Sequence, residues 1–136
     1  LPRLLKPGNL RLGHPLVFGA LDGVIEADEA LVGSAFHNLI DNAAKYSPAG
    51  SDIEVSTTVN TDEVGIHVKD SGIGLSPEEQ RQIFDKYYRA SESQSTPGLG
   101  LGLFFVDQVM QAHAGRVCVD TKPGVGSTFT LWFSRR

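Results

Sequence analysis

The sequence of 136 residues has one cysteine, one methionine and one tryptophan. The single cysteine, Cys118, excludes a disulfide within the chain and is typical of a reducing compartment. It stands in the strand-like segment "GRVCVD", where we expect a small buried hydrophobic residue and not a reactive thiol. The chain begins with Leu1 and its methionine is Met110. We therefore expect a domain excised from a longer protein.

Charge of one sign and long apolar runs are also lacking. Lysine and arginine number 12, aspartate and glutamate 16, and the net charge is −4. This charge balance does not indicate the excess of positive charge that is typical of nucleic-acid-binding proteins. No apolar run is long enough to span a bilayer. The length is close to the commonest domain size, so we expect one domain over residues 1–136.

Apolar periodicity predicts an α+β protein. Alternating residues predict two hairpins, one over 52–59 and 63–70 and one in "RVCVDTKPGVGSTFTLWF". Helices are expected from Asp28 to about Tyr46, from Ser76 to about Tyr88, and from the glycines near 100 to Gly115. A further strand is expected at 23–27, and 89–98 is predicted to be mobile. Because neighbouring strands pair and one sheet face must be covered, the prediction is a two-layer α/β sandwich with a mostly antiparallel sheet.

The first motif is "HNLIDNAAKYSP" at 37–48. On a helix, Asn38, Asn42, Lys45 and Tyr46 share one face beside apolar core positions. Amide oxygens are ligands that Mg²⁺ accepts, so this face could bind a ligand. The alternative is an ordinary solvated helix face.

The second motif is "VKDSGIGLSPEE" at 68–79. Asp70 is in phase with the inward-facing Val64, Ile66 and Val68, so its carboxylate points to the buried side and needs a donor. An adenine amino group could supply that donor, and the glycines at 72 and 74 permit close approach of a flat ring. The alternative is an Asp-Ser-Gly turn in which local backbone satisfies the carboxylate.

Two later stretches could contact phosphate. In "IFDKYYRA" (83–90), Arg89 could reach a terminal phosphate, or it could be a surface arginine. In "TPGLGLGLFF" (96–105), the glycines match neither the dinucleotide fingerprint nor the P-loop. They do free backbone amides at a helix start, an arrangement that attracts anions.

Together with the closing "GVGSTFTLWF", these four stretches resemble, in type, order and spacing, the catalytic ATP-binding domain of bacterial sensor histidine kinases. That domain belongs to a wider group that includes gyrase, Hsp90 and MutL. The resemblance covers about residues 22–134. It implies the Bergerat ATP-binding fold, with about five strands, three helices on one face and a mobile ATP lid at about 89–101.

The resemblance also implies roles for individual residues. Asn42 would bind Mg²⁺ with help from Asn38, Asp70 would bind the adenine amino group, and Thr128 would support the adenine site. Lys45 and Arg89 would approach the phosphates. The remaining residues expected to contact ATP are Tyr46, Gly72, Ile73, Gly74, Tyr87, Gly98, Leu99, Gly100, Leu101, Gly102 and Leu103.

The resemblance further separates a kinase from a hydrolase. Hydrolases of the group carry a glutamate one helical turn before the metal-binding asparagine, and here that position is Asn38, which cannot take a proton from water. None of the four histidines is followed by an acidic residue, as the phosphorylated histidine of the family is. The implied acceptor is thus a separate dimerisation domain of the parent protein.

The implied parent protein is a homodimer, is anchored in the bacterial inner membrane with this domain in the cytoplasm, and acts on a response regulator. Two other readings stay open. One is a serine kinase of an anti-sigma system, and the other is a nucleotide-binding pseudokinase module.

Overall fold

The computed structural model describes residues 10–11, 14–18, 27–48, 50–85 and 102–135. In chain order the elements are β1 (Leu10–Arg11), β2 (His14–Phe18), α1 (Glu29–Tyr46), β3 (Ile53–Val59), β4 (Glu63–Asp70), α2 (Pro77–Gln82), α3 (Gly102–Ala112), β5 (Arg116–Lys122) and β6 (Gly126–Ser134). The strand predicted at 23–27 falls outside the described residues except for Ala27, which belongs to no element.

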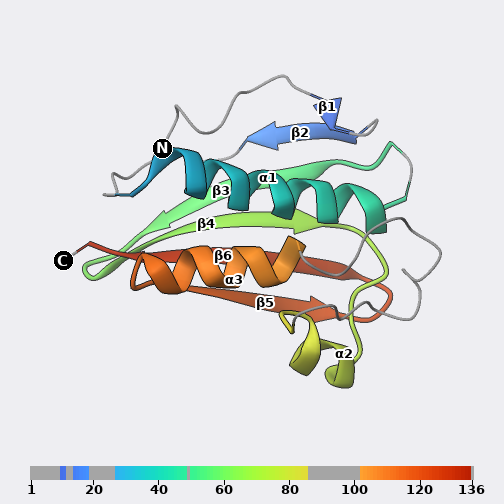
Figure 1. The fold of residues 1–136 in the computed structure, drawn as a ribbon. Helices are drawn as coiled ribbons and strands as arrows, with labels where there is room; N and C mark the ends of the chain where they lie inside the picture. The colour runs from blue at the N-terminus through green and yellow to red at the C-terminus, as the bar shows by residue number, and fades with distance from the viewer. Residues whose placement is uncertain (1–9, 12–13, 19–26, 49, 86–101, 136) are drawn as a thin grey trace.

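The strands form one mixed sheet in the order β1-β2-β3-β4-β6-β5 (Figure 1). Both predicted hairpins are present, and every pairing is antiparallel except that of β2 with β3. Helix α1 makes the crossover between these two parallel strands. The α+β class is confirmed, with six strands in the described part of the chain where about five were expected.

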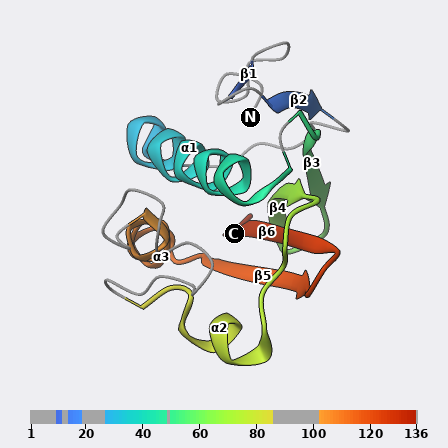
Figure 2. The same cartoon turned by 90° about the vertical axis from the view of Figure 1, so that its right-hand side faces the viewer.

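Helices α1 and α3 lie side by side over one face of the sheet, whereas α2 lies beside the edge strand β5 (Figure 2). Helix α1 begins as predicted, because the Asp28 side chain accepts a hydrogen bond from the Leu31 amide at 3.0 Å. Helix α2 begins with the predicted capping box but ends at Gln82, short of the expected Tyr88. It buries no residue of its own, and the following Phe84 packs edge-on against Phe129.

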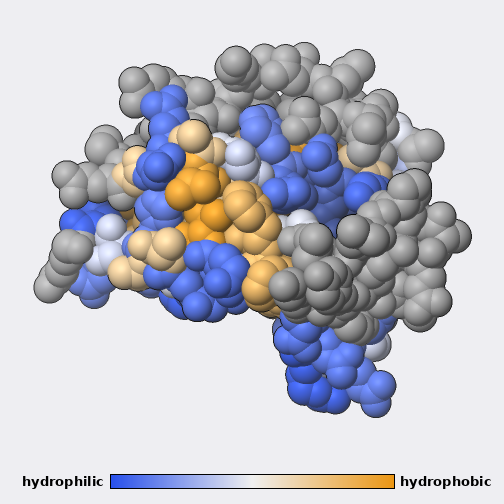
Figure 3. All heavy atoms as spheres, in the orientation of Figure 1, coloured by the Kyte–Doolittle hydropathy of each residue, from blue (hydrophilic) through white to orange (hydrophobic). Residues whose placement is uncertain are grey.

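The core lies between the helical layer and the sheet. Side chains that are at most 1% exposed come from α1, α3, β3, β4 and β6, among them Leu39, Val55, Ile66, Met110 and Leu131. Apolar surface also follows the seam between α1 and α3 (Figure 3). The prediction that Cys118 is buried is wrong: β5 alternates, its inward residues are Val117 and Val119, and Cys118 is exposed on the other face.

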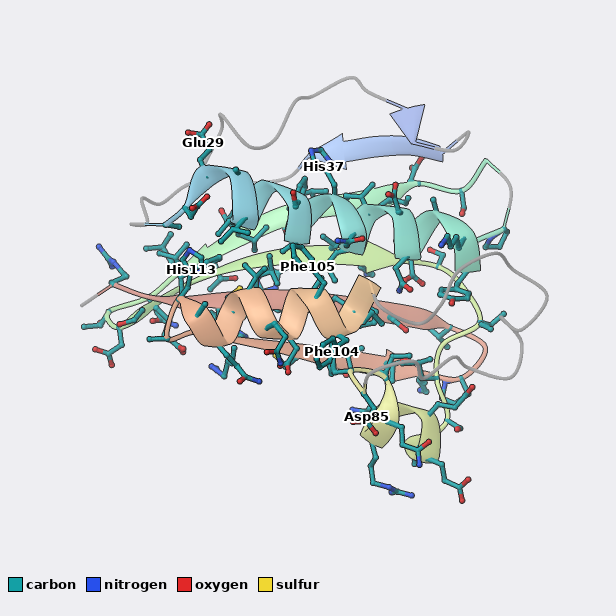
Figure 4. All side chains as sticks on the ribbon, viewed as in Figure 1. Glu29, His37, Asp85, Phe104, Phe105 and His113 are labelled. Carbon is teal, nitrogen blue, oxygen red and sulfur yellow. The ribbon has the colours of Figure 1, made fainter. Side chains whose placement is uncertain are left out.

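His113 joins the two long helices at one end (Figure 4). Its Nδ1–H donates to the Val109 carbonyl at 2.8 Å, and its Nε2 accepts from the Asp28 amide at 3.0 Å. The end of α3 is thereby tied to the start of α1. Among the described helices, none is both long and apolar enough to cross a membrane.

Candidate functional site

A pocket of about 360 Å³, partly open to solvent, lies where α1, the loop after β4 and the start of β6 meet. The lining residues are Asn42, Tyr46, Asp70, Ile73, Gly74, Leu75, Ile83, Ser127 and Phe129. Five of these were predicted as site residues from the sequence: Asn42, Tyr46, Asp70, Ile73 and Gly74. The structure thus brings the first two sequence motifs together in one hollow.

Asp70 is the buried charge of the pocket. It ends β4 and is 5% exposed. Its Oδ1 accepts from the Gly72 amide at 2.9 Å and from the Ser127 amide at 3.3 Å. Burial raises the pKa of this carboxyl, and the two backbone donors act in the opposite direction. The local turn and the ligand site are therefore compatible, because the turn engages one carboxylate oxygen and the side chain still lines the pocket.

Two glycines let the loop after β4 approach the backbone at the end of α1 and at the end of β5. A Cβ at Gly72 would overlap the carbonyl oxygen of Tyr46, at the end of α1. Gly74 has φ +70°, and a Cβ there would overlap the carbonyl oxygen of Lys122. The glycines predicted for close approach to a ring thus also permit close approach of backbone on both sides of the pocket.

The polar face of α1 runs from the pocket toward the start of α3. Asn42 lines the pocket, and Asn38 lies one turn earlier, where its Oδ1 is 3.4 Å from the position that a Cβ on Gly102 would take. Lys45 is in the last turn of α1 and is exposed. Leu103 packs partly buried against the core. Asn38 therefore lies beside the amino end of α3, and the amino end of a helix favours anions through the helix dipole.

Thr128 requires a correction. On β6 it pairs with Lys69 and Asp120, whereas Ser127 pairs with Asp70 and lines the pocket. Successive side chains on a strand point to opposite faces, so Thr128 faces away from the pocket. The hydroxyl beside Asp70 belongs to Ser127. The alternation of Ser127 with Phe129 and Leu131 in the sequence was the signal that could have identified it.

The sequence reasoning also missed Leu75, Ile83 and Phe129, which supply apolar walls. Six predicted site residues lie outside the described part of the chain: Tyr87, Arg89, Gly98, Leu99, Gly100 and Leu101. The expected lid at 89–101 lies there as well.

Comparison with known proteins identifies the class. Residues 27–136 match the family model described as histidine kinase-, DNA gyrase B- and HSP90-like ATPase. The chain belongs to this family, which makes it an ATP-binding domain.

Among curated proteins, it is similar to the sensor-like histidine kinase SenX3 of Mycobacterium bovis, with 42% identity over 106 residues, 76% of this chain and 26% of the relative. It is also similar to the heme sensor protein HssS of Staphylococcus saprophyticus, with 34% identity over 111 residues, 82% of this chain and 24% of the relative. The chain thus spans about a quarter of the length of these relatives.

Alignment with solved structures supports the same family. The mycobacterial sensor histidine kinase MprB aligns with TM-score 0.80 and 28% identity, covering 88% of this chain and 82% of that chain. Full-length ShkA in complex with AMPPNP aligns with TM-score 0.76 and 26% identity, covering 90% of this chain and 26% of that one. The chain therefore has the fold of the catalytic domain of sensor histidine kinases.

Proposed function

We propose that this domain binds Mg-ATP in the pocket beside Asp70 and donates the γ-phosphate to a histidine on another domain of its parent protein. The observation that carries the proposal is the buried carboxylate of Asp70. Its Oδ1 is held by two backbone amides, while the side chain borders a hollow whose exposed lining surface is mostly apolar. A flat heterocycle with an exocyclic amino group suits this pocket, because the amino group can donate to the carboxylate.

The polar residues of α1 suit a hydrated Mg²⁺. No cluster of three or more His, Cys, Asp or Glu side chains that could hold a metal occurs in the part of the chain that the structure describes. Mg²⁺ commonly keeps several waters and takes few protein ligands together with phosphate oxygens. The amide oxygens of Asn42 and Asn38 fit that demand beside the amino end of α3. The ion would neutralise phosphate charge.

The remaining predicted contacts complete the proposal. Lys45 and Arg89 would reach the phosphates, Tyr46 and Tyr87 would border the nucleotide, and residues 89–101 would form the lid. Gly102 and Leu103 begin α3, whose first amides would face the phosphates. With an amide at Asn38, the site has no base there for activating water, so ATP would be retained until an acceptor arrives.

The acceptor in this proposal is a histidine on the dimerisation domain of the same parent protein, which would act as a homodimer on a cognate response regulator. We further propose that the parent protein is anchored in the bacterial inner membrane. The support comes from the sensor kinase relatives, of which this chain spans about a quarter.

Calorimetry with Mg-ATP tests the metal assignment. Asn42→Ala removes an oxygen ligand, so we expect at least about tenfold weaker binding of Mg-ATP, since a contact to a charged group contributes about 1.5–3 kcal/mol. Omitting Mg²⁺ should weaken wild-type binding much more than N42A binding. Ser34→Ala, on the exposed side of the same helix, is the matched control and should bind like wild type. An N42A variant that binds as tightly and with the same Mg²⁺ dependence would contradict the assignment.

Phosphotransfer tests the wider proposal. The domain, mixed with the dimerisation domain of its parent protein and ATP, should produce acid-labile phosphate on that domain. Acid-stable phosphoserine would indicate a serine kinase instead. ATP binding with no transfer to any domain of the parent protein would indicate a nucleotide-binding module.

Adjacent hydroxyls on β6 offer a matched pair for the base pocket. Ser127→Ala should weaken ATP binding about three- to tenfold, because a neutral hydrogen bond contributes about 0.5–1.5 kcal/mol. Thr128→Ala, a half-buried position on the opposite sheet face, should stay within about twofold of wild type, because its side chain does not face the pocket. Competition binding against a fluorescent ATP analogue measures both. A larger loss in T128A than in S127A would restore the original assignment to Thr128.

A further inference from the structure

A threonine hydroxyl behind the pocket joins two of its walls. Thr121, near the end of β5, is half-buried and is not itself among the lining residues. Its Oγ1 accepts from the Leu75 amide at 2.8 Å and lies 2.7 Å from the Ser127 hydroxyl. It can also donate to the Gly126 carbonyl at 3.2 Å. Leu75 and Ser127 both line the pocket, so one hydroxyl connects the loop after β4 to the start of β6.

The position of Thr121 in β5 shows why the hydroxyl matters. Val117 and Val119 precede it on the same face of the strand and pack against the core. A valine at 121 would continue this apolar series with similar shape. A half-buried hydroxyl is favourable only where it has partners. The Thr121 hydroxyl has a partner both as acceptor and as donor. It accepts from the Leu75 amide, and its proton can reach the Gly126 carbonyl or the Ser127 hydroxyl.

The bonded series continues from Thr121 to the buried carboxylate. Ser127 is held by Thr121 through its hydroxyl, and its own amide donates to Oδ1 of Asp70 at 3.3 Å. Thr121 occupies one hydrogen-bonding position of the Ser127 hydroxyl. Only the remaining hydrogen-bonding position of the Ser127 hydroxyl can therefore face the pocket. Thr121, which lies outside the pocket, therefore sets how the Ser127 hydroxyl is oriented relative to Asp70.

We propose that Thr121 is a positioning residue for purine recognition and acts through Ser127; this inference rests on the proposed nucleotide site. It fixes the Ser127 hydroxyl and the Leu75 end of the loop so that the pocket distinguishes a purine with a 6-amino group from one with a 6-oxo group. Asp70 accepts from the amino group, and a correctly turned Ser127 hydroxyl completes the polar edge. Without Thr121 the hydroxyl can rotate, and a 6-oxo purine is less strongly rejected.

The test compares ATP with ITP, which carries a 6-oxo group, using the whole chain and competition binding. Thr121→Val should reduce the ATP-over-ITP preference at least about fivefold, and Thr121→Ser, which keeps the hydroxyl, should restore it to within about twofold. Thermal unfolding of each variant is recorded in parallel, because a purely structural role would lower stability without changing the preference. Should T121V fail to fold, Thr121→Cys replaces it with a weakly bonding thiol, and the same reduction is expected.

A double variant identifies the route of the effect. If Thr121 acts through Ser127, adding T121V to S127A should change the preference by less than about twofold beyond S127A alone. If the reductions in ATP-over-ITP preference caused by T121V and by S127A were fully additive in the double variant, the inference would be overturned. Wild-type ATP binding with an unchanged preference in T121V would also overturn it, and would leave the proposed function intact. Failure of the wild-type chain to bind ATP would overturn the proposed function and this inference together.

Discussion

Asp70→Asn should make the nucleotide-free domain more stable at pH 7 and weaken ATP binding about 10- to 100-fold. The stability gain follows from burial: the carboxylate is 5% exposed, and burial raises its pKa above the ordinary value of 3.8, so the charged form is disfavoured in the folded state. The amide keeps an oxygen for the Gly72 and Ser127 donors. The binding loss follows from replacing a charged acceptor, which contributes about 1.5–3 kcal/mol to a hydrogen bond.

The stability difference between D70N and wild type should depend on pH in a definite direction. Because the folded-state pKa of Asp70 is raised, its contribution to stability is fully present below the unfolded value of 3.8 and is lost as pH rises through the folded pKa. The advantage of D70N over wild type should therefore be largest near neutral pH and should vanish as pH falls toward 3.8. Denaturant titrations at several pH values measure this difference. Equal stability of D70N and wild type at every pH would show that burial does not oppose the charge.

Gly72→Ala should destabilise the domain by about 3 kcal/mol and abolish measurable ATP binding, since overpacking of a close contact costs about 1–3 kcal/mol and sometimes more. The new Cβ would overlap the Tyr46 carbonyl and approach Oδ1 of Asp70 at 3.0 Å. Backbone stands on one side, so relief requires the end of α1 and the loop after β4 to separate. Both structures line the pocket, and their separation displaces Tyr46 and Ile73. Thermal unfolding and calorimetry with Mg-ATP measure the two effects.

Gly124→Ala is the matched control for this variant. Gly124 has φ +78°, and a Cβ there would meet nothing within 4 Å. The substitution should cost about 1–2 kcal/mol of backbone strain and leave ATP affinity within about twofold of wild type. If G72A and G124A were to lose affinity equally, the close approach of the loop to α1 would not be what shapes the pocket.

The sequence predicted those features that depend on local chemistry. The start of α1 follows from the Asp28 cap, and the inward direction of Asp70 follows from its phase with Val68. The parallel pairing of β2 with β3 was not predictable, because it joins Leu16 to Ile53 across a crossover that local periodicity does not encode. For Cys118, alternation alone left open which face the helices cover. Thr128 was misplaced by a single residue, which on a strand exchanges the two faces.

The end of α2 shows the same limit. A helical pattern through Tyr88 was expected, yet the helix stops at Gln82, and the buried Ile83 and half-buried Phe84 follow it. Contacts with β6 across the pocket wall, such as that of Phe84 with Phe129, are tertiary and override local preference. The grouping of Asn38 with Gly102 is likewise a contact between two helices distant in sequence.

The hydrogen bond between Asp70 and Ser127 spans 57 residues of chain. Loop closure of that length must occur before the two groups meet, and the pairing of β4 with β6 must be complete at its last rung. The base pocket therefore exists only once β4 and β6 have paired along their full length, and a fragment that ends before Ser127 lacks it. A ligand that binds there selects the completely folded molecule. At one hundred times its dissociation constant it would add about 2.7 kcal/mol to the global unfolding free energy, so the fraction of unfolded chain falls as the nucleotide concentration rises.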